Sequence, residues 1–269
     1  MNRYEQMFSR LAASGEGAFV PFVVMGDPDQ VASLGIIDAL VAGGADALEL
    51  GIPFSDPVAD GPVIQAAAGR AIAAGTTPES CLGLLKQIRK RHPALPIGLL
   101  VYSNLVVHDD PEQFFQRLGQ TGVDSILIAD IPGVELAPYA ELALAAGIAP
   151  ILIVPPNATE TCLTRVAKLG RGYTYLLGRA GVTGIQTATQ RPAKQLIDAL
   201  KQSGAPPALL GFGISNPEHV RAAIESGAQG AISGSAIVQI IAANLYDEKV
   251  RTAALTQFVI TMKAATRKK

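Results

Sequence analysis

Length, composition and charge exclude several classes of protein. The chain has 269 residues, of which 49% are hydrophobic and 17% charged, and its formal net charge at pH 7 is -1. This is enough apolar material for one large core. A nearly neutral chain lacks the basic surface that nucleic acids and anionic membranes attract, so we expect neither as a partner.

The targeting signals of secreted and membrane proteins are missing from the sequence. No apolar run approaches the roughly 20 residues of a spanning helix, and the first residues lack the apolar core of a signal peptide. Cys81 and Cys162 lie far apart in helix-like segments, which suits reduced thiols better than a disulfide. We therefore predict a cytoplasmic protein.

Strand-like and helix-like patterns alternate along the chain. Tyr4, Met7, Phe8 and Leu11 recur at helical spacing and predict an N-terminal helix that lies under the floor of a barrel. Eight short apolar runs then predict strands: Ala18 to Val24, Ala47 to Gly51, Ile97 to Val101, Ser125 to Ala129, Ala149 to Val154, Tyr173 to Leu177, Ala208 to Phe212 and Gly230 to Ser233. Amphipathic stretches with Pro near their start separate the runs.

Apolar strands that alternate with helices are typical of a parallel sheet covered by helices. Eight such units without a break in composition favour a closed barrel over an open doubly wound sheet, and the length is close to the roughly 250 residues usual for that fold. We predict one α/β domain over residues 1–269, a single (β/α)8 TIM barrel. It would carry an extra N-terminal helix and a short extra helix after the eighth strand.

One acid, Glu49, lies inside a predicted strand between Leu48 and Leu50. Because side chains alternate across a strand, Glu49 points to the opposite face from its apolar neighbours, which is the inner face. An acid placed there either serves a function or has a partner that the sequence does not reveal. Burial should raise its pKa towards neutrality, as a general acid needs.

The loop that follows contains Asp56 and Asp60 among Pro and Gly residues. A segment so rich in Pro and Gly cannot continue the preceding strand and cannot form a helix. We expect Asp60 to be solvated and ionised, so that it can stabilise positive charge on a ligand.

Three glycine clusters follow the last three predicted strands: Gly181 to Gly184, Gly211 to Gly213, and Gly234 with Ser235. Barrels often bind phosphate with the loops after strands seven and eight and the N-terminus of a short helix. Arg179 is the only nearby cation, so the binding would rely on backbone N–H groups. The plain alternative is that these glycines only form tight turns.

Apolar side chains at or near strand ends are candidates for a slot that takes a flat ring, with ordinary barrel packing as the equal alternative. They are Phe22, Ile64, Leu100, Leu127, Ile153, Tyr175 and Phe212. Tyr102 and Asn104 also lie on this rim, and we expect Asp27 and Asp130 to anchor turns or loops.

Two classes of enzyme are disfavoured because the residues that they need are missing from the expected places. A Schiff-base aldolase needs a lysine at a strand end, yet every lysine falls in a predicted helix or the tail. A metal aldolase needs clustered histidines, whereas His92, His108 and His219 are scattered. We expect no metal site.

Several long motifs, in order along essentially the entire chain, resemble those of the tryptophan synthase α subunit family. They are ALELGIPFSDPVADGPVIQ, PIGLLVYSNLV, RGYTYLL, GVTG, PALLGFGIS and GAISGSAIV. The resemblance implies cleavage of indole-3-glycerol phosphate to indole and glyceraldehyde 3-phosphate. It also implies a β subunit partner in an α2β2 complex, with pyridoxal phosphate on the β subunit and no cofactor in this chain.

The resemblance also implies roles for individual residues. Glu49 would be the general acid and base, Asp60 would bind the indole N–H group, and Tyr175 would lie beside the catalytic acid. Phosphate contacts would fall on Gly184, Gly213, Gly234 and Ser235, a mobile lid would contain Arg179 and Thr183, and Asp56, Pro57 and Asn104 would face the β subunit. A stand-alone lyase and a phosphate-binding regulatory subunit remain as alternatives, and the presence of both acids favours catalysis.

Overall fold

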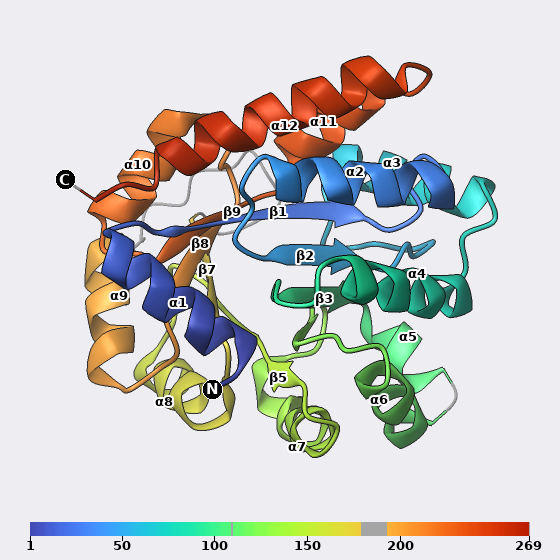
Figure 1. Ribbon diagram of the computed structural model, residues 1–269. Coiled ribbons are helices and arrows are strands. Elements are labelled where there is room, and N and C mark those ends of the chain that lie inside the picture. Colours follow the sequence, from blue (N-terminus) through green and yellow to red (C-terminus); the bar gives the residue numbers. More distant parts are fainter. Residues whose placement is uncertain (109, 179–192, 269) are drawn as a thin grey trace.

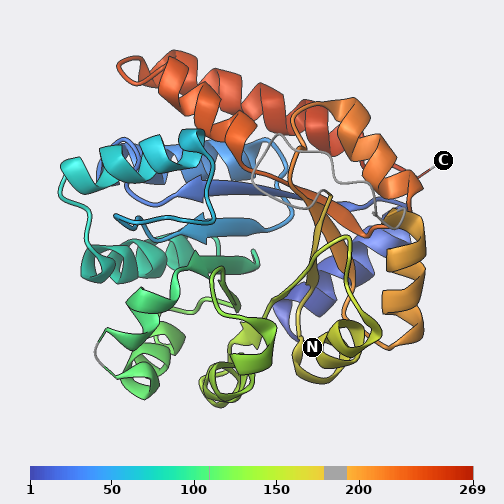
Figure 2. The ribbon, with the colours of Figure 1, turned by 180° about the vertical axis from the view of Figure 1, so that it is seen from behind.

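The computed structural model describes residues 1–108, 110–178 and 193–268. Its centre is one parallel sheet surrounded by helices (Figures 1 and 2). The strands in this part of the chain are β1 Ala18–Val24, β2 Leu48–Gly51, β3 Ile97–Val101, β4 Ser125–Ile128, β5 Ala149–Pro150, β6 Leu152–Val154, β7 Thr174–Leu177, β8 Ala208–Gly211 and β9 Gly230–Ser233. Their order in the sheet is β5-β4-β3-β2-β1-β9-β8-β7-β6.

The sheet closes on itself between β5 and β6. These two strands stand at opposite ends of the sheet order, yet only Ile151 separates them in the chain. The backbone N–H of Ile151 donates to the carbonyl of Ile126 at 2.8 Å. The predicted barrel is confirmed, with one difference: the fifth predicted strand is divided, because its first part pairs with β4 and its second with β7.

Helices surround the barrel, along its outside and at its floor (Figure 1). They are α1 Arg3–Ser14, α2 Gln30–Ala42, α3 Pro62–Ala73, α4 Pro78–Arg91, α5 Ser103–Val107, α6 Pro111–Gly119, α7 Ala137–Ala145, α8 Glu160–Leu169, α9 Ala193–Gln202, α10 Pro217–Glu225, α11 Ser235–Ala243 and α12 Glu248–Ala264, with a 3-10 turn η1 at Gly133–Glu135. Proline stands in the first turn of α3, α4, α6, α7 and α10, where its missing N–H costs no hydrogen bond. Of the helices described, none is long and apolar enough to cross a bilayer.

Alternation along the strands divides the core into an inner and an outer layer. In β1, Val20 and Phe22 join the cluster inside the barrel, whereas Phe19 and Val23 pack outward against the helices. In β2, Leu48 and Leu50 belong to the outer layer, so Glu49 between them points inward as predicted. The cysteines are free thiols, Cys81 buried and Cys162 half-buried.

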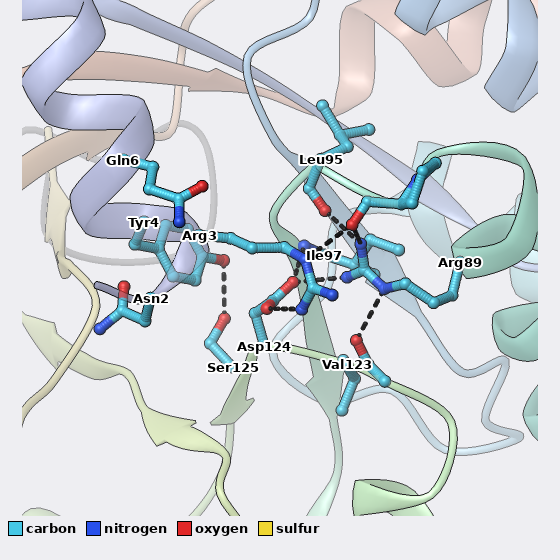
Figure 3. Close-up of polar contacts among 12 residues, drawn as sticks. Asn2, Arg3, Tyr4, Gln6, Arg89, Leu95, Ile97, Val123, Asp124 and Ser125 are labelled. Atoms are coloured by element: carbon cyan, nitrogen blue, oxygen red, sulfur yellow. Dashed lines mark hydrogen bonds and ion pairs between the residues drawn. The ribbon is translucent and has the colours of Figure 1, made fainter.

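Helix α1 forms the barrel floor. Its buried residues Tyr4, Met7 and Leu11 join the inner cluster, which confirms the predicted floor helix. Figure 3 shows two of its attachments, from Tyr4 to Ser125 and from Arg3 to Asp124. The Tyr4 hydroxyl lies 2.8 Å from Oγ of Ser125, and the Arg3 guanidinium lies 2.8 Å from Oδ1 of Asp124. Arg89 of α4 pairs with the other oxygen of Asp124 at 2.6 Å. The floor is therefore fixed, which leaves the opposite end of the barrel for ligands.

Candidate active site

A cavity of about 330 Å³ opens at the C-terminal ends of the strands. Loops and helices that follow several different strands enclose it. Its lining is Phe22, Glu49, Ala59, Asp60, Gly61, Pro62, Val63, Ile64, Leu100, Tyr175, Phe212, Gly213, Ile214, Ser215, Ile232, Gly234, Ser235, Ala236 and Gln239. The cavity thus brings together both predicted catalytic acids, Tyr175 and three of the predicted phosphate contacts.

Glu49 is 1% exposed, and its two carboxylate oxygens differ. Oε1 accepts a hydrogen bond of 2.7 Å from the hydroxyl of Tyr173, while Oε2 has no partner among the described residues. Burial raises the pKa of Glu49 from 4.5 to about 7, against the opposing effect of the Tyr173 hydrogen bond. A carboxyl group tuned in this way can donate and accept a proton near neutral pH.

Tyr173 is a residue of the site that the sequence reasoning missed. Its ring packs at a centroid distance of 5.5 Å against Tyr4 of the floor helix, so it lies between the floor and the acid. Tyr173 and Tyr175 are two positions apart, and that spacing places both on the inner face. The spacing was the available signal, although it does not say which hydroxyl meets Glu49.

Asp60 departs from the expectation of a solvated loop acid. It is half-buried, and this burial raises its pKa, an effect that the Tyr102 hydrogen bond opposes. The Tyr102 hydroxyl donates to Oδ2 of Asp60 at 2.9 Å. The loop is less solvated than its composition indicates because a side chain from the end of β3 packs against it.

Tyr175 lines the cavity, and it makes no hydrogen bond to either acid among the described residues. Its pKa is raised well above 10, first by burial and then by the charges of Glu49 and Asp60. The phenol therefore stays neutral. Close packing against Gly211 of β8 sets its position, because a Cβ on that glycine would overlap the phenol ring.

The glycine-rich end of the cavity is formed by Gly213, Gly234 and Ser235. Gly234 precedes α11 and Ser235 is its first residue, so free backbone N–H groups of the first turn face this end. Among the described residues, no lysine or arginine lines the cavity. Gly184, Arg179 and Thr183 lie outside the described residues.

Apolar side chains line the remaining walls. Phe22, Ile64, Leu100 and Phe212 border the cavity, whereas Leu127 and Ile153 pack in the inner cluster and do not border it. Phe212 has φ 67°, which is unusual for a residue with a side chain. Phe212 is 40% exposed and borders the cavity.

Asp27 and Asp130 anchor loops, as predicted. Asp27 is 1% exposed, and its carboxylate accepts two hydrogen bonds of 2.8 Å from the guanidinium of Arg70 in α3. Asp130 accepts from the backbone N–H and the hydroxyl of Ser103 at 2.7 and 2.8 Å. Both acids have protein partners, so neither is a free catalytic group.

The predicted partner residues lie beside a second cavity of about 620 Å³, which Asp56 and Asn104 line together with residues of α4, α5 and α6. Pro57 is not part of this lining. Exposed apolar residues lie on the segments that follow neighbouring strands: Val58 is 74%, Val107 41% and Val134 72% exposed. Val58 follows β2, Val107 is the last residue of α5 after β3, and Val134 lies in η1 after β4, so three adjacent connections present apolar side chains to solvent.

Comparisons with known proteins agree with this geometry. The family model for the tryptophan synthase alpha chain matches residues 8–267. The tryptophan synthase alpha chain of Yersinia pseudotuberculosis serotype O:1b (strain IP 31758) is 58% identical over 267 residues, 99% of this chain and 100% of the relative. That of Yersinia enterocolitica serotype O:8 / biotype 1B is also 58% identical over 267 residues, with the same coverage.

Solved structures give the same result. Tryptophan synthase subunit alpha from Legionella pneumophila superposes with a TM-score of 0.87 at 28% identity, over 99% of this chain and 98% of that one. A chain of the tryptophan synthase α2β2 complex from Pyrococcus furiosus has a TM-score of 0.80 at 31% identity, over 92% and 98%. From its sequence, fold and cavity, the chain belongs to the tryptophan synthase alpha chain family.

Proposed function

We propose that this chain cleaves indole-3-glycerol phosphate to indole and glyceraldehyde 3-phosphate. The observation that carries the proposal is the shared cavity: a buried acid with a pKa of about 7 and a second, half-buried acid line it together with a helix N-terminus. The apolar walls suit a flat indole ring, and the end formed by Gly234 and Ser235 suits its phosphate group.

The proton transfers of the reaction balance on these residues. Protonated Glu49 donates its proton to C3 of the indole ring, and Asp60 accepts a hydrogen bond from the ring N–H group as positive charge develops on that nitrogen. Glu49 takes the proton of the adjacent side-chain hydroxyl as the bond to C3 breaks. The electron pair of that bond returns to the ring, which leaves indole, and the side chain departs as the aldehyde.

Phosphate binding is assigned to the backbone near Gly213, Gly234 and Ser235, with Gly184 as a further contact. Glycines allow close approach of the main chain to the anion, and the N-terminus of α11 adds a favourable dipole. Arg179 and Thr183 would belong to a lid over the ligand that excludes water. Leu127 and Ile153 would support the ring pocket from within the inner cluster.

A β subunit that carries pyridoxal phosphate is the proposed partner, in an α2β2 complex in the cytoplasm. The exposed Val58, which follows Pro57 in the chain, and the exposed Val107, which lines a cavity with Asp56 and Asn104, support a protein contact on this rim. The Pyrococcus furiosus relative forms an α2β2 complex.

Indole release by the purified chain, measured alone and with a β subunit, tests the proposal. Cleavage that the β subunit accelerates supports it. Equal rates in both conditions identify a stand-alone lyase, and ligand binding without turnover in either condition identifies a regulatory subunit.

A further inference from the structure

The hydroxyl of Tyr102 is placed between two consecutive residues of the loop that carries the second acid. It accepts the backbone N–H of Ala59 at 3.1 Å and donates to Oδ2 of Asp60 at 2.9 Å. A phenol has a single proton. Because the Ala59 N–H group occupies a lone pair of the Tyr102 oxygen, the hydroxyl proton points to the Asp60 carboxylate. The two hydrogen bonds together fix that carboxylate relative to the backbone of its own loop.

The ring of Tyr102 is fixed as well. The residue is 2% exposed, and its ring stacks on Phe54 at a centroid distance of 5.2 Å and an interplanar angle of 25°. Phe54 belongs to the same loop as Asp60, between β2 and α3. Tyr102 therefore contacts this loop at both ends, with its ring at Phe54 and its hydroxyl at Ala59 and Asp60.

The backbone that carries Tyr102 is anchored to a third loop. Tyr102 precedes α5, and the next residue, Ser103, donates both its N–H and its hydroxyl to Asp130 after β4. These contacts connect the ends of β4, β3 and β2 in sequence. The backbone of Tyr102, whose side chain binds Asp60, is thus held in place by the contacts of Ser103.

We propose that Tyr102 is a positioning residue for Asp60, whose carboxylate it holds in the direction and ionisation state needed for the indole N–H group. The inference rests on the proposed function. It assigns the hydroxyl of Tyr102 no contact with the substrate.

The charges around the pair agree with this role. Burial raises the pKa of Asp60 and the Tyr102 hydrogen bond lowers it. The pKa of Tyr102 is itself raised above its usual value, mainly by burial and then by the charge of Asp60, with a smaller effect of Asp130, so the hydroxyl keeps its proton. Glu49 on β2 and Tyr175 on β7 are the other titratable side chains described in the cavity.

The test is Tyr102→Phe, which keeps the stacked ring and removes the hydroxyl. In the complex with the β subunit, we expect kcat/KM for indole-3-glycerol phosphate to fall by about 10-fold to 100-fold, the effect of one hydrogen bond to a charged group. The acidic limb of its pH profile should move to higher pH, because the ionised form of Asp60 loses a donor. Tyr246→Phe, which alters a fully exposed phenol, is the matched control.

Two further measurements separate positioning from a structural role. In an Asp60→Asn background, Tyr102→Phe should cause little additional loss. NMR can follow the chemical shift of the Asp60 carboxyl carbon against pH, and the signal is assigned by its loss in Asp60→Asn. Asp60 should titrate at higher pH in Tyr102→Phe than in the wild type, whether or not the protein turns over substrate.

An unshifted Asp60 titration, or a Tyr102→Phe profile identical to that of Tyr246→Phe, overturns the inference. A lowered melting temperature with an unshifted pH profile also overturns it, since that pattern assigns Tyr102 to stability alone. Absence of cleavage by the wild type would defeat the proposed function and leave the NMR titration to decide the role of Tyr102.

Discussion

The hydroxyl of Tyr173 lies 2.7 Å from Oε1 of Glu49, while Oε2 of the same carboxylate has no partner among the described residues. The bonded oxygen fixes the side chain, and the other is left for the substrate. This asymmetry gives one carboxyl group the two properties that acid–base catalysis requires, a defined position and an available oxygen.

Glu49→Gln should abolish nearly all cleavage and leave the fold and ligand affinity intact, because the amide keeps the shape of the side chain and transfers no proton. General acid–base catalysis is typically worth about 100-fold or more. The measurements are indole release, circular dichroism and a ligand titration. A variant that retains more than about a tenth of the wild-type rate would contradict the assignment of Glu49.

The same variant tests the raised pKa through stability. The folded-state pKa of Glu49 is about 7, against an ordinary pKa of 4.5 for this side chain, so the folded state favours the protonated form. The stability contributed by that proton is complete below pH 4.5 and is lost as the pH rises through 7. The free energy of unfolding of the wild type should therefore fall by on the order of 3 kcal/mol across this pH range.

Glu49→Gln has no such proton to lose. Denaturant unfolding of both proteins at pH 5 and pH 8 measures the difference, and the variant should gain stability relative to the wild type at the higher pH. An equal difference at both values would mean that the carboxyl group titrates near its ordinary pKa.

Tyr173→Phe should move the titration of Glu49 to higher pH. The hydrogen bond from Tyr173 lowers the pKa of Glu49 against the larger effect of burial, so its loss leaves burial unopposed. The pH profile of kcat/KM measures the shift: because Glu49 must be protonated to donate, the alkaline side of the profile should lie at higher pH than in the wild type. Tyr246→Phe again supplies the control, and coincident profiles would count against the role of Tyr173.

Alternation of side chains is why the sequence predicts the inward position of Glu49 and the apolar inner face of β1. Alternation does not say whether Tyr173 or Tyr175 contacts Glu49. The two strands β2 and β7 are not neighbours in the sheet, so the residues that face each other across the barrel depend on the stagger of all the strands. The half-burial of Asp60 is likewise unpredictable from its own loop, since it depends on Tyr102 from another strand. The local sequence therefore predicts the helices and strands, whereas the contacts across the cavity depend on how the barrel closes.

Gly211→Ala should disturb the cavity through Tyr175. A Cβ at Gly211 overlaps the buried phenol ring, so the ring must move towards the substrate or the strands must separate. We expect a loss of about 1–3 kcal/mol in the free energy of unfolding, together with a fall in kcat/KM. Gly83→Ala is the control, because nothing lies within 4 Å of its Cβ, and this helix position should gain up to about 1 kcal/mol. Wild-type kinetics in Gly211→Ala would show that Tyr175 has room to adjust.

Gly213→Val should weaken the binding of glycerol phosphate and of substrate together. Gly213 has φ 79° and nothing within 4 Å of its Cβ, so the side chain would project into the space assigned to the anion. We expect Kd to rise by about 10-fold or more, as for the loss of a hydrogen bond to a charged group. Gly204→Val is closely matched, with φ 76°, open space around its Cβ and no place in the cavity lining. Equal phosphate affinity in the two variants would assign the effect to backbone strain.

Asp56→Ala should reduce the acceleration by a β subunit more than it reduces the basal rate. Asp56 is exposed, its carboxylate accepts the hydroxyl of Ser55, and it borders the cavity that Asn104 also lines. Asp60 lies four residues further along the same loop, and the Asp60 N–H donates to the carbonyl of Pro57 at 3.0 Å. A loop held at one end by a partner and at the other by substrate couples the two binding events reciprocally.

The alternative is that Asp56 only stabilises its turn, in which case the substitution lowers the melting temperature and the basal rate alike. Indole release with and without saturating β subunit, measured beside the melting temperature, decides between the two. Asp29→Ala serves as a control for the loss of one exposed loop acid, since Asp29 caps α2 with two hydrogen bonds of 2.9 Å. It should lose about 1 kcal/mol of stability and keep the wild-type response to the β subunit. A normal response in Asp56→Ala would remove this residue from the coupling and leave Asn104 as the next position to test.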